Sequence, residues 1–124
     1  MDENLAMEFD KLEYRLNSVF IEFDKLSKKK PDDVINPYKL KIINSLLSET
    51  NNLFDKGDIP IDKFTLFEDS ELPTYSDIVI VLTQFLEKLD YFRFRNIISD
   101  FSGVYWILDD GERIKTKGSK YAQK

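Results

Sequence analysis

Seven apolar residues near the N-terminus recur at alternating spacings of four and three, and this pattern constrains the fold more than any other feature. They are Leu5, Phe9, Leu12, Leu16, Val19, Phe23 and Leu26. Such spacing defines a heptad seam along one face of an α-helix. Asp2 and Glu3 precede the seam, three lysines at 28–30 follow it, and Pro31 ends it, as helix termini favour. We predict a helix over about residues 2–29.

Two further helices and a pair of strands are predicted after it. Asn36 is a good N-cap for a helix over about 37–56, and Thr74 with Asp77 resembles a capping box for a third helix. We interpret the third helix as running to residue 102 with Gly103 as its C-cap, and a strand within 91–102 is the alternative. An Asp-Gly turn at 109–111 separates a β-branched and aromatic strand at 104–108 from a second strand at 113–116. Residues 64–67 are a further candidate strand.

These elements predict a mainly α fold. We expect a three- or four-helix antiparallel bundle with a small C-terminal β-hairpin, formed by one domain over 1–116 and followed by a flexible basic tail over 117–124. The predicted core consists of Phe9, Leu12, Leu16, Val19, Phe23, Leu40, Ile43, Leu47, Phe54, Ile78, Leu82, Phe85, Leu89, Ile98 and Trp106.

The composition excludes several chemistries. The sequence has no His and no Cys, which removes imidazole acid–base catalysis, thiol nucleophiles and the usual zinc sites. The carboxylate pairs Asp32-Asp33 and Asp109-Asp110 fall in predicted turns, where Asp is favoured for backbone reasons. The four glycines form no phosphate-binding motif. We therefore expect a non-enzymatic protein with no metal and no cofactor.

Charge is unevenly distributed along the chain. Residues 113–124 hold five Lys or Arg and no Asp or Glu, so the net charge of −5 combines a basic tail with a body of about −10. The N-terminal residues lack a secretory pattern, and the longest aliphatic run, residues 78–82, is far shorter than the roughly 20 residues that span a bilayer. We expect a cytoplasmic protein that does not enter a membrane.

An acidic loop is the favoured site for a partner protein. It combines carboxylates, which match a basic surface, with a tyrosine, a residue type enriched at binding hot spots. The candidate residues are Glu68, Asp69, Glu71, Tyr75 and Asp77. We predict a protein–protein interaction module, an adaptor or inhibitor, that binds a partner with a basic surface. The alternative is a solvated loop ahead of a helix.

Two other interactions stay open. The heptad seam packs inside the monomer, which we favour, or forms a homodimer through Leu5, Phe9, Leu12, Leu16, Val19, Phe23 and Leu26. The alternative function is nucleic-acid association, because basic residues interleaved with rings can hold phosphates and stack on bases. Its candidate residues are Arg93, Arg95, Arg113, Lys115, Lys117 and Lys120. The competing interpretation is that the rings belong to the core and that Arg93 and Arg95 form surface ion pairs.

Overall fold

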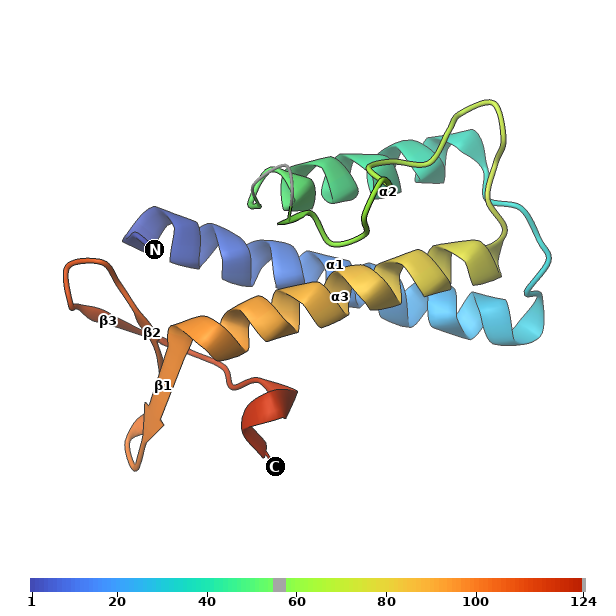
Figure 1. Ribbon diagram of the computed structural model, residues 1–124. Helices are drawn as coiled ribbons and strands as arrows, with labels where there is room; N and C mark the ends of the chain where they lie inside the picture. Colours follow the sequence, from blue (N-terminus) through green and yellow to red (C-terminus); the bar gives the residue numbers. More distant parts are fainter. Residues whose placement is uncertain (55–57, 124) are drawn as a thin grey trace.

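The computed structural model describes residues 1–54 and 58–123, which form three helices, a three-stranded antiparallel sheet and a short 3₁₀-helix (Figure 1). The elements are α1 (Glu3–Lys29), α2 (Pro37–Asn51), α3 (Tyr75–Asn96), β1 (Ile97–Asp100), β2 (Gly103–Ile107), β3 (Arg113–Thr116) and η2 (Lys120–Gln123). The predicted bundle with a C-terminal hairpin is therefore wrong, because a third strand turns the hairpin into a sheet.

The helices are not arranged as an antiparallel bundle. α1 and α3 lie side by side in opposite directions, whereas α2 and α3 run in the same direction (Figure 1). The starts of α2 and α3 are adjacent. Val34 forms an isolated antiparallel β-bridge with Thr74, and the Ile35 N–H donates to the Pro73 carbonyl at 3.0 Å. Residues 58–73 bring the chain back to that end. The connection is long enough to reverse direction, which a short bundle loop is not.

Side-chain hydrogen bonds hold this returning loop to α2. The Asn44 amide both accepts from the Phe67 N–H and donates to the Phe67 carbonyl, each at 3.0 Å, and Asn51 donates to the Thr65 carbonyl at 2.9 Å. These three backbone groups of the loop thus pair with side chains of α2 and not with a neighbouring strand. The candidate strand at 64–67 is wrong, since the only pairing described there is an isolated bridge between Ile61 and Phe64.

The predicted helix starts are confirmed. Asp2 accepts from the Leu5 N–H, Asn36 accepts from the Lys39 N–H, and Thr74 and Asp77 form a reciprocal capping box. Each cap satisfies an N–H group that has no partner within its helix. The first helix ends at 29 as expected. α2 ends at Asn51, and residues 55–57 of the predicted helix end lie outside the described residues.

The predicted end of α3 is wrong. The helix ends at Asn96, whose side-chain amide donates to the Phe92 carbonyl at 2.8 Å, and Ile97 then pairs with Trp106 in the sheet. Gly103 begins β2 at φ 143°, where it is not a helix C-cap. The Asp-Gly turn and the pairing of β2 with β3 are present. Two strands alone are marginal in water, and β1 supplies the third.

The core is formed mainly where α1 packs against α3. Burial is confirmed for most of the predicted core: Phe9, Leu12, Leu16, Phe23, Leu40, Ile43, Leu47, Ile78, Leu82, Phe85, Leu89 and Trp106. Val19 and Phe54 are half-buried against it. The prediction that Ile98 belongs to the core is wrong. Successive side chains of a strand point to opposite faces, so Ile97 packs inward and Ile98 is 43% exposed. Four seam residues are fully buried within the single chain, which favours packing inside the monomer over a homodimer.

Candidate functional site

An open groove of about 590 Å³ lies between the loop before α3 and the first turns of α3. Its lining includes the apolar side chains of Leu66 and Ile80, which are 40% and 58% exposed. Isolated exposed apolar residues are ordinary, but two that share one concave lining form a potential contact surface. Phe64 and Val81 extend this apolar lining.

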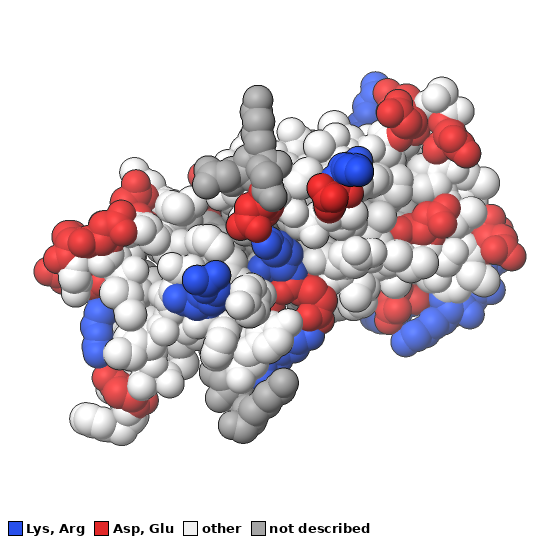
Figure 2. Space-filling model, in the orientation of Figure 1, with Lys and Arg blue, Asp and Glu red and all other residues white. Residues whose placement is uncertain are grey.

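Three of the five predicted partner-binding residues line this groove. Glu68, Glu71 and Asp77 are exposed and surround its apolar part, while Asp69 is exposed on the same loop. Figure 2 shows several carboxylates at this end of the molecule and others at the opposite end. Lys63 is also among the lining residues. The groove therefore combines an apolar lining with mainly acidic edges, a combination that suits a basic amphipathic segment.

Tyr75 and Asp77 have structural contacts of their own. Tyr75 is half-buried, and its ring packs edge-on against Phe23 with centroids 5.7 Å apart. It is not part of the groove lining. Asp77 accepts from the Thr74 N–H at 3.0 Å, so this carboxylate caps α3 and faces the groove at the same time. The acidic residues could be predicted from the sequence, but Leu66 and Ile80 could not, because nothing local marks them as neighbours.

Arg93 is buried, not exposed as the nucleic-acid alternative requires. Its guanidinium donates to Glu13 at 2.8 and 3.2 Å and to Asp10 at 2.5 Å. It also donates to the Thr116 hydroxyl at 2.6 Å and to the Lys117 carbonyl at 3.0 Å. All five N–H groups of the side chain thus have an acceptor.

The same guanidinium lies against two aromatic rings. Its central carbon is 4.7 Å from the Trp106 ring centroid and 5.6 Å from that of Phe9. The Trp106 indole N–H donates to Asp10 at 3.1 Å. Arg93 therefore joins α1, α3 and the sheet, and its role in the structure is to hold these elements together.

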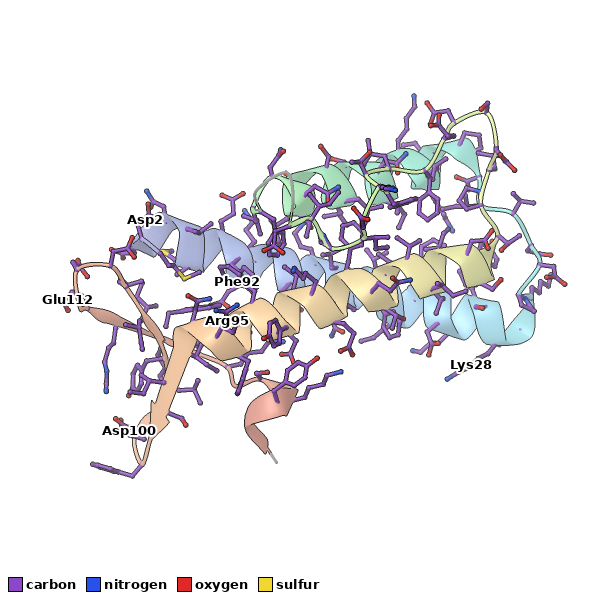
Figure 3. The ribbon with its side chains drawn as sticks, viewed as in Figure 1. Asp2, Lys28, Phe92, Arg95, Asp100 and Glu112 are labelled. Carbon is purple, nitrogen blue, oxygen red and sulfur yellow. The ribbon has the colours of Figure 1, made fainter. Side chains whose placement is uncertain are left out.

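The other candidate cations are dispersed. Arg113 pairs with Asp100 at 3.1 Å, Lys117 with Glu13 at 3.0 Å, and Lys120 with Glu87. Lys115 is exposed on β3, and Arg95 lies over the Tyr91 ring at 5.9 Å. Figure 3 shows Arg95 near the sheet end of α3 and Asp100 at the turn between β1 and β2. With Arg93, four of the six candidates pair with carboxylates of the same chain.

The segment predicted as a basic tail contacts α3. Ser119 is buried and donates to Asp90 at 3.0 Å, and Lys120 pairs with Glu87. The hydrogen bond from Lys120 lowers the pKa of the Glu87 carboxyl, and the same bond raises the pKa of Lys120. Desolvation, followed by the bond to Glu87, raises the pKa of the Tyr121 phenol. These contacts stabilise the ionised carboxylate and ammonium.

No known protein family, curated protein or solved structure matches this chain. Within residues 1–54 and 58–123, no helix is both long enough and apolar enough to cross a membrane. The same residues contain no group of three or more acidic side chains placed to hold a metal ion.

Proposed function

We propose that this protein is a non-enzymatic protein–protein interaction module that binds a basic partner protein through the groove beside α3. The observation that supports this proposal is the combination of exposed Leu66 and Ile80 with Glu68, Glu71 and Asp77 around one groove. Apolar contact supplies affinity, and the carboxylates supply orientation and a faster encounter with a basic surface.

The partner segment has a defined chemistry under this proposal. A large apolar side chain contacts Leu66 and Ile80, and flanking Lys or Arg residues approach Glu68 and Glu71. Both carboxylates are exposed, so their contribution is screened by salt. Affinity for the partner should therefore fall as the ionic strength rises, while the apolar contact persists.

The decisive test compares affinity capture by the wild-type chain with capture by two charge-reversal variants. Glu68→Lys with Glu71→Lys should reduce recovery of the partner at least tenfold. Glu8→Lys with Glu22→Lys changes the net charge equally at exposed positions on α1 and should leave recovery unchanged. Equal loss in both variants would mean that overall charge, and not the groove, governs binding.

A second variant separates a groove from a simple acidic patch. Ile80→Ser removes an exposed apolar side chain, and such a surface change alters stability by only about 0.5 kcal/mol. It should weaken partner capture several-fold while the charge of the loop stays the same. Capture that is insensitive to Ile80→Ser would refute the groove as the binding surface. Capture of nucleic acid in place of protein would favour the alternative function.

A further inference from the structure

One face of α3, at the opposite end of the helix from the groove, is occupied by the C-terminal segment of the same chain. Glu87, Asp90, Tyr91 and Phe94 stand at positions i, i+3, i+4 and i+7, so they share a helix face. The segment Ser119–Lys120–Tyr121 lies on this face (Figure 1), where the start of η2 meets α3.

Each residue of the segment contacts a matching group on α3. The Ser119 hydroxyl and the Lys120 N–H donate to Asp90 at 3.0 and 3.2 Å. The Lys120 ammonium pairs with Glu87, and the Tyr121 hydroxyl donates to the same carboxylate at 3.2 Å. Two carboxylates of α3 thus recognise a hydroxyl, a backbone N–H, an ammonium and a phenol.

Two rings of α3 receive the aromatic side chain. The Tyr121 ring centroid lies 5.7 Å from that of Tyr91, nearly perpendicular to it, and 5.7 Å from that of Phe94. Edge-on and tilted ring pairs at such distances are favourable. Tyr91 and Phe94 are still 44% and 41% exposed. The rings therefore keep open surface with the segment in place.

We propose that this face of α3 is a binding surface for a short partner segment with a hydroxyl residue, a cation and an aromatic ring in succession, and that Ser119–Lys120–Tyr121 occupies it as a tethered competitor. The ion pair between Lys120 and Glu87 is about half exposed on both sides, and exposed pairs add little stability. Release of the segment from this face also requires the buried Ser119 hydroxyl to leave Asp90. This surface is separate from the groove and does not depend on the function proposed for it.

The probe is a synthetic peptide with the sequence of residues 117–124. The receiving protein is the full chain carrying Lys120→Ala and Tyr121→Ala, which retains the buried Ser119. In ¹⁵N NMR spectra, the peptide should shift the amide signals of residues 87–94 back toward their wild-type positions. Peptide at about millimolar concentration is used, because a tethered segment samples its surface at an effective concentration of that order.

Three comparisons decide the outcome. The wild-type chain should respond at least fivefold more weakly than the variant, because its own segment competes. A peptide with Ala in place of Lys120 and Tyr121 should produce no shift. Adding Glu68→Lys and Glu71→Lys to the variant should leave peptide binding unchanged, since the groove is elsewhere.

Several results would overturn the proposal. Absence of peptide-induced shifts in a folded variant would show that the segment is not exchangeable, and equal shifts in variant and wild type would show binding at another place. Unfolding of the variant would show that Lys120 and Tyr121 are required for folding and are not an exchangeable segment. A wild-type dimer that dissociates on Lys120→Ala would assign the surface to a second copy of the chain.

Discussion

Replacing Arg93 by Met should destabilise this protein more than almost any other single change at a charged residue. The side chain is completely buried, and all five of its N–H groups donate to acceptors on α1, β3 and the segment after it. Met retains most of the apolar stem but donates nothing. Among the residues that the structure describes, Glu13, whose side chain is 5% exposed, would keep only the exposed ammonium of Lys117 at 3.0 Å.

The expected loss follows because the buried Glu13 carboxylate loses both guanidinium hydrogen bonds and keeps only a partner whose side chain is 63% exposed. Breaking a buried ion pair by removing one partner costs about 3–5 kcal/mol, a large part of the roughly 5–15 kcal/mol that stabilises a typical domain. Urea unfolding followed by circular dichroism measures this loss. A matching fall in Tm on the order of 15 °C is expected for a chain of this size.

Two companion variants test the cause. Arg95→Met removes an exposed arginine two positions along the same helix and should change stability by no more than about 0.5 kcal/mol. Adding Glu13→Leu to Arg93→Met removes the buried carboxylate that has lost its guanidinium partner and should recover about 1 kcal/mol or more. Two results would refute this reasoning: a loss of less than about 1 kcal/mol for Arg93→Met, or a double variant whose loss in free energy of unfolding equals the sum of the two single losses. Either would show that the buried pair does not hold the fold together.

Two further predictions concern α3. Thr74→Ala removes one half of the capping box and should cost about 1 kcal/mol in urea unfolding; Ser at the same position should restore most of it, and equal stability of the Ala and Ser variants would contradict the capping role. The hydrogen bond from Lys120 lowers the folded-state pKa of Glu87. The contribution of Glu87 to the stability of the fold is therefore present above the unfolded-state pKa and is lost as the pH falls through the folded-state pKa. Glu87→Gln should remove the acid-side change that Glu87 causes in the NMR signals of Tyr91, and an unchanged profile would refute the assignment.

The starts of the helices were predictable because capping is local. Each cap joins a side chain to a backbone N–H three residues along the chain, so the residues that decide it are adjacent in the sequence. The heptad seam was equally informative, because its periodicity requires one buried face whatever covers it.

The end of α3 was not predictable by local reasoning. Phe94, Ile97, Ile98 and Phe101 fit helical spacing, yet two adjacent isoleucines also suit a strand. The outcome depends on pairing between Ile97 and Trp106 and on the turn in which Asp100 accepts from Ser102. That pairing is a tertiary interaction, and the sequence up to residue 102 contains no signal for it.

The candidate site was predictable only in part. Exposed acidic residues in a Pro-containing loop identified Glu68 and Glu71, but the groove exists because α2 holds the returning loop through Asn44 and Asn51. The burial of Arg93 likewise depends on Asp10 and Glu13, about 80 positions earlier in the sequence. Alternation of rings and arginines at 92–95 did not reveal which arginine turns inward.

Trp106 gives the protein a built-in optical reporter at one particular junction. It is the single tryptophan, it is fully buried, and it contacts α1 through Phe9 and Asp10 and α3 through Arg93. Its emission therefore responds to separation of the sheet from the helices, whereas far-ultraviolet dichroism responds chiefly to the helices themselves. Coincidence of the two signals during denaturation would show one cooperative unit, and an earlier red shift of the emission would show that the sheet detaches first.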